Sequence, residues 1–187
     1  MSIRVHIIFL EITSKEIDMI IQEILNYHGI NSIWHFTDRS NLTSISEFGL
    51  LSLNSILTRG IEVARYGATQ SSHMQDRRKN LHKFVHLSFI QDHPMYYNAK
   101  ADGRIIDPVW IEIDLSVMTT SNTLFSNMLA NTYNADIFTA ESLAQKIDFN
   151  TILHCPDFNT RKEARKAEIM VQGQISIDQI KGIYNGN

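Results

Sequence analysis

Three groups of residues in this sequence combine types and spacing that could bind an anion or move a proton. The first is His35, which lies between aromatic residues in Trp34-His35-Phe36-Thr37. One interpretation is a core imidazole that donates to a backbone carbonyl. The other is a ligand pocket at the end of a strand, where the amides of a following helix could bind an anionic group. The sequence segment leaves both interpretations open.

The second group is a short basic run in a polar segment, Met74-Gln75-Asp76-Arg77-Arg78-Lys79. Two adjacent guanidinium groups can bind phosphate through paired hydrogen bonds, which would suit a dinucleotide or a nucleic-acid backbone. A solvated charge run has the same composition. This segment therefore needs support from elsewhere in the chain before it is assigned to a site.

The third group is a basic segment that leads into an apolar strand at Glu168. If the segment is helical, residues four apart share one basic face, with Glu163 diluting its charge. The basic residues are Arg161, Lys162, Arg165 and Lys166. A carboxylate such as Glu168 near positive charge can stabilise a cation or accept a proton, although a glutamate at this place can also simply keep a strand edge soluble.

Several other chemistries are excluded or disfavoured. His82 and His86 have the spacing of a metal pair on a helix, but residues 84–89 have the pattern of a strand, where that spacing separates the two side chains; we predict no metal site. The single cysteine, Cys155, excludes an internal disulfide framework and is expected to be a buried, inert thiol. The glycine-rich phosphate-binding motifs and the nucleophile elbow of hydrolases do not occur.

Length and composition indicate a globular protein. The chain has 187 residues, of which 43% are hydrophobic and 20% charged, and its net charge is −3. We therefore expect a single domain over residues 1–187 and a local anion groove rather than a strongly basic nucleic-acid binder. The N-terminal apolar run Ile7–Leu10 is too short to span a bilayer and does not resemble a signal peptide, so we expect a cytoplasmic protein.

In the first half of the chain, local patterns predict two helices and a strand. Thr13 and Glu16 have capping-box spacing, an apolar stripe follows, and Gly29 can end a helix over residues 13–29. A strand is expected at 32–36, followed by a helix that is capped by Asp38 or Ser40 and ends at Gly49. Residues 52–83 are expected to form a long loop with one short helix near 73–81.

In the second half, strands dominate. Alternating apolar residues predict strands at 84–89, 108–115 and 168–175, and a proline in the first turn favours a helix at 94–101. Residues 119–134 are expected to form a loop or a weak helix. Together these elements predict an α+β domain with a central, mostly antiparallel sheet flanked by helices.

The order of several short segments resembles the DarT family, which ADP-ribosylates bases in single-stranded DNA. The resemblance covers roughly residues 33–183. Its N-terminal part is carried by His35-Phe36-Thr37, Asn41-Leu42, Ile45, Gly49-Leu50-Leu51, Asp76-Arg77-Arg78 and Leu81-His82-Lys83-Phe84-Val85. Its C-terminal part is carried by Pro94-Met95, Ile147-Asp148-Phe149 and Ala167-Glu168-Ile169-Met170-Val171.

This resemblance implies an ADP-ribosyltransferase-like fold with NAD as the ADP-ribose donor and no metal. It implies that His35 and Thr37 lie on the nicotinamide side, that Asn41 lies near the dinucleotide, and that Glu168 is the catalytic glutamate. Arg78 matches the essential arginine of the family, with Arg77 as the fallback. Residues 155–167 match the loop that presents the base, so its four basic residues and Lys79 are expected to bind DNA.

The family also implies a toxin, paired with an antitoxin that contains an ADP-ribose-removing macrodomain. This sequence departs from the family pattern at Asp92-His93, at His86-Leu87-Ser88 and in the additional residues 1–31, where an extra strand or helix is expected. These departures favour guanine over thymine as the target base. The alternatives that remain open are a transferase of the same fold that acts on protein or RNA, and a non-catalytic nucleic-acid-binding module.

Overall fold

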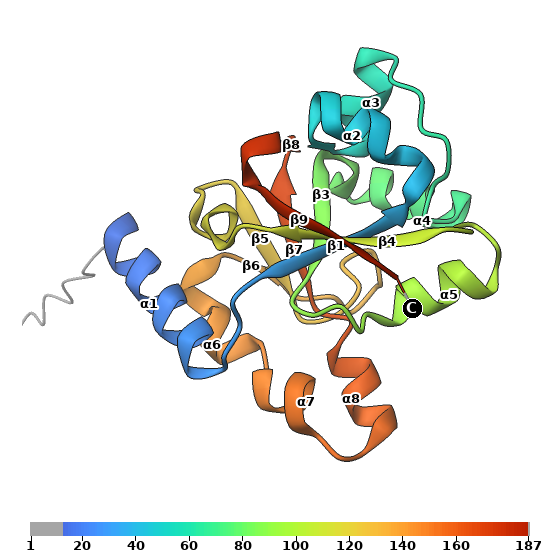
Figure 1. Ribbon diagram of the computed structural model, residues 1–187. Helices are drawn as coiled ribbons and strands as arrows, with labels where there is room; N and C mark the ends of the chain where they lie inside the picture. Colours follow the sequence, from blue (N-terminus) through green and yellow to red (C-terminus); the bar gives the residue numbers. More distant parts are fainter. Residues whose placement is uncertain (1–12, 187) are drawn as a thin grey trace, which may run out of the picture.

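The computed structural model describes residues 13–186, and its centre is a seven-stranded antiparallel sheet (Figure 1). The strand order is β6-β5-β7-β3-β1-β4-β9. This confirms the predicted α+β class and the antiparallel sheet. The strands are β1 (Ile33–Asp38), β3 (Phe84–Ser88), β4 (Pro108–Ile113), β5 (Thr123–Ser126), β6 (Ile137–Phe138), β7 (Glu168–Gln172) and β9 (Ile180–Asn185).

The two halves of this sheet, β6-β5-β7-β3 and β1-β4-β9, are joined by a single residue pair between β3 and β1. β1 pairs with β4 along its whole length, from Ile33↔Ile113 to Asp38↔Pro108. On its other side, β1 pairs with β3 only through Trp34↔Ser88, and β3 instead follows β7 along its whole length. Beyond Trp34 the strands β1 and β3 therefore diverge, and the backbone on both sides of the divergence can face a ligand rather than a neighbouring strand.

Helix α1 (Ser14–Tyr27) forms as its sequence predicts. Thr13 and Glu16 make the reciprocal capping box, and Gly29 adopts a φ of +65° just after the helix. Ile21 and Leu25 are buried in the main hydrophobic core beside Ile33 of β1. Helix α1 lies within the extra N-terminal segment expected over residues 1–31, and residues 1–12 of that segment lie outside the described residues.

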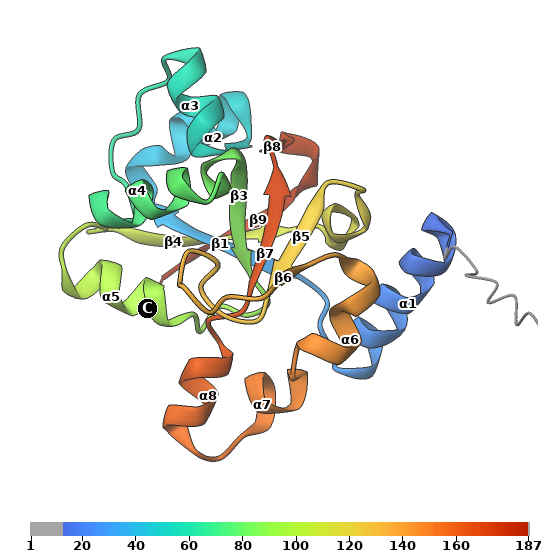
Figure 2. The same ribbon diagram turned by 180° about the vertical axis from the view of Figure 1, so that it is seen from behind.

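The other helices lie around the sheet in three groups (Figures 1 and 2). Near one end of β3 lie α2 (Leu42–Phe48), α3 (Leu53–Arg59) and α4 (Gln70–Arg78). Helix α5 (Pro94–Ala101), whose bounds are those predicted, packs Tyr96 against Trp110 of β4. At the opposite end lie α6 (Leu143–Lys146), α7 (Phe149–His154) and α8 (Phe158–Ala164). No helix of residues 13–186 is long and apolar enough to cross a membrane.

Three predictions of local structure were wrong. Residues 52–83 are not mainly loop, because Ser52 caps α3 and its amide donates to the carbonyl of Gly173, 2.8 Å away. Residues 119–134 include β5, which pairs with β7. The strand predicted at 168–175 is interrupted at Gly173, which has a φ of +81°. The chain beyond it, β8 (Gln174–Ile175), pairs with β2 (Leu50–Leu51) in a separate two-stranded sheet.

Candidate active site

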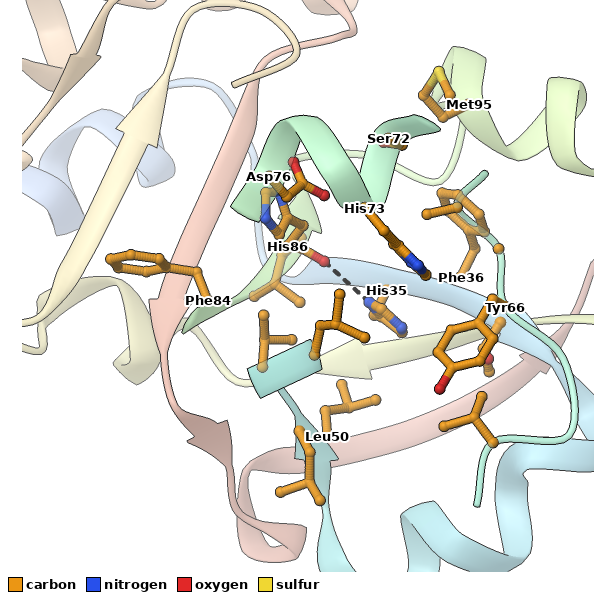
Figure 3. A pocket seen from close by; sticks show the side chains of 18 of the residues that line it. His35, Phe36, Leu50, Tyr66, Ser72, His73, Asp76, Phe84, His86 and Met95 are labelled. Atoms are coloured by element: carbon orange, nitrogen blue, oxygen red, sulfur yellow. Dashed lines mark hydrogen bonds between the residues drawn. The ribbon is translucent and has the colours of Figure 1, made fainter. Parts of the chain in front are cut away.

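A pocket of about 530 Å³ lies where β1 and β3 diverge (Figure 3). Its volume is within the range of small-ligand sites. Residues of β1, β3 and α4 line it, together with Glu168 at the start of β7 and two loops, which comprise residues 61–69 and 129–132. His35, Asp76 and Glu168, one residue from each of the three groups in the sequence analysis, thus line one cavity, whereas the basic residues of the second and third groups do not.

His35 lines this pocket as a neutral imidazole. Its Nδ1 lies 3.0 Å from the backbone oxygen of His86, across the divergence between the two strands (Figure 3). A carbonyl oxygen can only accept, so Nδ1 carries the hydrogen and Nε2 is left as an acceptor. Burial lowers the pKa of His35, an effect that outweighs the His86 carbonyl and keeps the ring uncharged. His35 therefore donates to a carbonyl, as in the first interpretation, and also lines a pocket; its role in binding a ligand stays a prediction.

Asn41 and Thr37 are buried in the wall of the pocket. The Asn41 amide nitrogen donates to Thr37 Oγ1 at 3.0 Å and to the Arg65 carbonyl at 2.7 Å. The Arg65 amide donates in return to Asn41 Oδ1 at 3.1 Å. Both amide hydrogens and the amide oxygen of Asn41 are thus used within the chain. Asn41 holds in place the segment that carries Arg65.

Arg65 is a site residue that the sequence analysis missed. It is half-buried, and it is the only arginine or lysine among the described residues that line the pocket. Arg77 and Arg78, which were predicted to bind the cofactor, are exposed in the last turn of α4 and do not line the pocket. Arg65 lies in a loop with no other basic residue beside it in the sequence. Only the hydrogen bonds between its backbone and Asn41, whose amide also donates to Thr37, indicate that it belongs to the pocket wall.

Glu168 lies at the base of the site with one carboxylate oxygen anchored. Its Oε2 accepts from the Ala130 amide at 2.9 Å and from Nδ1 of His86 at 3.3 Å. Within residues 13–186, Oε1 has no hydrogen-bond partner. The side chain is 13% exposed, and burial acts to raise its pKa. The charge and hydrogen bond of His86, together with the Ala130 amide, outweigh burial, so the net pKa of Glu168 is lowered and the group is ionised at neutral pH.

Asp76 is a second carboxylate in the pocket wall, and it is buried. Burial raises its pKa, and the nearby Glu168 carboxylate raises it further, while the charge of His86 and an Asn131 hydrogen bond lower it. Its Oδ1 is buried without a hydrogen-bond partner in the described part of the chain. Such an atom costs free energy unless a proton or a ligand satisfies it, so Asp76 is suited to receive a hydrogen-bond donor.

The basic residues that were predicted to bind DNA differ in whether their side chains already form ion pairs or hydrogen bonds within the chain. Arg165 pairs with Asp92 and donates to the carbonyl of Ile152, 2.9 Å away. Lys166 pairs with Glu163 at 2.6 Å. Helix α8 ends at Ala164, so the continuous basic face predicted for residues 161–166 does not extend to Arg165 and Lys166.

Two further basic residues also bond within the chain. Arg161 donates to the carbonyl of Cys155, a residue that is half-buried rather than buried as expected. Lys79 donates to the carbonyls of Ala130 and Thr132, so its ammonium group holds the loop that supplies the Glu168 amide contact. Lys162 is exposed on α8 and has no intramolecular partner in residues 13–186.

The site contains no cluster suited to a metal. Within residues 13–186, no three His, Cys, Asp or Glu side chains come together in a way that could hold a metal ion. The His82 and His86 spacing does not create one, because His86 points one ring nitrogen at Glu168 and the other at the Leu81 carbonyl. The polar groups of the pocket instead include two carboxylates, a guanidinium and an acceptor nitrogen.

Solved structures with the same fold include proteins from two organisms. Thermosipho africanus DarTG in complex with ADP-ribose has a TM-score of 0.70 and 19% identity, and the match covers 84% of this chain and 44% of that one. Thermus sp. 2.9 DarT in complex with ADP-ribosylated single-stranded DNA has a TM-score of 0.64 and 22% identity, covering 83% and 81% of the two chains. The same protein with carba-NAD+ has a TM-score of 0.62 and 21% identity. This chain thus spans less than half of the Thermosipho protein.

Sequence comparison assigns the family. No curated protein matches the chain significantly. The model of one family, described as DarT, ssDNA thymidine ADP-ribosyltransferase, matches residues 34–187. That range begins at β1 and includes every residue that lines the pocket. The match extends over most of the chain, and the protein therefore belongs to the DarT family.

Proposed function

We propose that this chain transfers ADP-ribose from NAD to a base of single-stranded DNA and releases nicotinamide. The observation that carries the proposal is the ionised, half-anchored carboxylate of Glu168 in a pocket with a single guanidinium side chain. Membership of the DarT family and the NAD-type and DNA-bound complexes of the Thermus protein support the choice of substrates.

The proposed reaction breaks the bond between nicotinamide and the ribose, and the bonding electron pair leaves with nicotinamide. The anomeric carbon becomes electron-poor, and the negative charge on Glu168 Oε1 stabilises it. A nitrogen of the base then attacks that carbon, and Glu168 accepts the proton that the nitrogen loses. Each step uses only the carboxylate, so no metal is required.

The remaining pocket residues supply binding and orientation. Arg65 can bind the diphosphate with paired hydrogen bonds, and its charge does not depend on pH in the physiological range. His35 offers Nε2 as an acceptor for an amide or hydroxyl hydrogen of the dinucleotide. Thr37 and Asn41 contribute by holding this wall in place. The prediction that Arg78 or Arg77 binds NAD remains open to test, but the pocket favours Arg65.

The acceptor is proposed to be thymine or guanine. The family description favours thymidine. The sequence departures at Asp92-His93 and at His86 favour guanine, and the buried Oδ1 of Asp76 could accept an N–H from either base. Lys162, exposed on α8, is the proposed DNA phosphate contact with the fewest competing partners. We also propose a toxin role with a macrodomain antitoxin, in line with the family resemblance.

The test is mass spectrometry of single-stranded oligonucleotides after incubation with NAD. Oligonucleotides that lack one base each identify the acceptor, and RNA of the same sequence and a bacterial protein extract are tested alongside. We expect ADP-ribose on one DNA base and its loss with Glu168→Gln, which keeps the side-chain size while removing the charge. Modification of RNA or protein alone would replace the proposed acceptor, and no modification of any of the three would refute transferase activity.

A further inference from the structure

His86 lies directly behind the proposed catalytic carboxylate but takes no part in the reaction described above. On the sheet, Ser88 is paired with Glu168 and His86 with Met170, so the His86 and Glu168 side chains are diagonal neighbours on one face of β3 and β7. The Nδ1 of His86 lies 3.3 Å from Glu168 Oε2, and its Nε2 lies 3.4 Å from the carbonyl oxygen of Leu81. Sequence analysis considered His86 as a possible metal ligand and as part of a departure from the family pattern, and it assigned the residue no role beside Glu168.

The two neighbours of the ring determine its protonation state. A carboxylate and a carbonyl both accept hydrogen bonds, and a neutral imidazole has only one N–H. His86 can donate to Glu168 and Leu81 at the same time only as the doubly protonated cation. The geometry therefore places a positive charge behind the carboxylate that the reaction needs.

We propose that His86 is a positioning residue, held as an imidazolium between Glu168 and Leu81, that fixes the carboxylate in its ionised form and turns Oε1 toward the substrate. This inference rests on the proposed function, because it assigns His86 a role in that same reaction. The anchored oxygen, Oε2, receives both the His86 and the Ala130 hydrogen bonds. The other oxygen is thereby left available to the anomeric carbon and the base.

The charge balance around the ring supports this role. Burial acts to lower the pKa of His86, but Glu168 and Asp76, with the Leu81 carbonyl, raise it to about 9. The other histidines near this cluster are His35, His73, His82 and His93; burial lowers the pKa of His35, His73 and His93, so none of these three rings supplies a second cation. His86 is thus the cation that keeps a largely buried Glu168 charged, while the like charge of Asp76 opposes it.

The consequence is a shift in the pH dependence of transfer. Without the cation, burial dominates at Glu168 and its pKa rises. The acid limb of the rate profile should then move to higher pH by about one unit or more, because an opposite charge at this distance changes a carboxyl pKa by 1–3 units. The maximal rate should also fall by about 10- to 100-fold, as is typical when the hydrogen-bond partner behind a reacting group is removed. KM for NAD should change little, since His86 does not hold the dinucleotide.

Three variants separate charge from hydrogen bonding. His86→Gln keeps a donor for Glu168 but removes the charge, and His86→Ala removes both. His28→Gln is the matched control, because His28 caps α1 and stacks on Phe149 away from this pocket. Transfer rates to single-stranded DNA are measured from pH 4 to pH 9 at saturating and limiting NAD. We expect both His86 variants to show the shifted acid limb, with the larger loss of rate in His86→Ala, and His28→Gln to match the parent.

Nitrogen-15 NMR of the histidine rings gives a readout that does not depend on activity. At pH 7 one ring should show two protonated nitrogens, and that signal should disappear in His86→Gln but persist in His28→Gln. If the signal is present and no transfer is observed in the parent protein, the proposed function fails while the imidazolium stands. A neutral His86 at pH 7, or an acid limb unchanged in both His86 variants, would overturn the inference.

Discussion

Replacing Arg65 with alanine should weaken NAD binding far more than replacing Arg78 or Arg77. Arg65 is the one arginine or lysine among the described residues of the pocket wall, and Asn41 holds its backbone through two hydrogen bonds of 2.7 and 3.1 Å. Arg77 and Arg78 are exposed at the end of α4 and outside the wall. The comparison therefore sets the sequence-based assignment directly against the one that the structure favours.

The expected size of the effect follows from the type of contact. A hydrogen bond to a charged group contributes about 1.5 to 3 kcal/mol, and the guanidinium of Arg65 sits in a half-buried position where solvent screening is reduced. That free energy corresponds to a loss of about 10- to 150-fold in NAD affinity. Arg65→Lys should fall between the parent and Arg65→Ala, because lysine keeps the charge but loses the paired geometry.

Calorimetric titration of NAD against the parent and the four variants (Arg65→Ala, Arg65→Lys, Arg77→Ala and Arg78→Ala) measures these affinities directly. Thermal unfolding in the absence of NAD shows whether each variant remains folded, and added NAD should raise the Tm of every variant that still binds it. A normal affinity in Arg65→Ala together with a large loss in Arg78→Ala would refute our assignment and restore the role predicted from the sequence. Losses of equal size would mean that both guanidinium groups bind the dinucleotide.

Three further predictions test other parts of the molecule. Lys162→Ala should reduce the slope of log affinity against log salt for single-stranded DNA by about 0.7, and Lys166→Ala should change it less because Lys166 is paired with Glu163; equal slopes would contradict this. Since burial lowers the pKa of His93 to about 4, whereas an unfolded histidine titrates near 6.5, the unfolded state binds more protons between these values. The free energy of unfolding from urea titrations should therefore fall as pH decreases from about 6.5 to 4, by up to about 3 kcal/mol, and His93→Asn should lose that part of the dependence. Asn41→Ala should speed the hydrogen exchange of the Arg65 amide and weaken NAD binding, and an unchanged exchange rate would show that the amide bond of Asn41 to Arg65 does not stabilise the loop.

Local sequence signals predicted the positions of helices correctly where the contacts that stabilise those helices are also local. The capping box of α1 and the proline start of α5 are contained within one turn, and both helices have the predicted positions. Helix α3 was missed because the carbonyl that its Ser52 amide meets belongs to Gly173, far along the chain. Strand β5, rich in polar residues, was missed because its partner is β7. The pairing of β5 is non-local, so no pattern within that segment predicts it, whereas α3 also has a local cap at Ser52 and a left-handed Gly60 at its end that the sequence analysis did not use.

Long-range pairing also decided which charged residues belong to the site. The prediction that His35 and Glu168 belong to a common site is consistent with the pocket, which both residues line. By contrast, basic residues that look equivalent in sequence have different surroundings: Lys79 is bonded to a loop, Arg165 to Asp92, and Lys162 to no described side chain. A charge run reveals its sign and spacing, but only the fold decides which charges are already neutralised.

By itself, the sequence determined the α+β class and the family, because periodicity, capping and motif order are properties of neighbouring residues. It also predicted His35 and Glu168 as site residues, and both line the pocket. Only the tertiary structure decided that Arg65 rather than Arg78 lines the pocket, and that His86 stands behind a carboxylate 82 positions away. Those relations depend on the register of β3 against β7 and on the divergence of β1 from β3. The register is set by the packing of whole strands against a shared core, and no spacing within one segment encodes it.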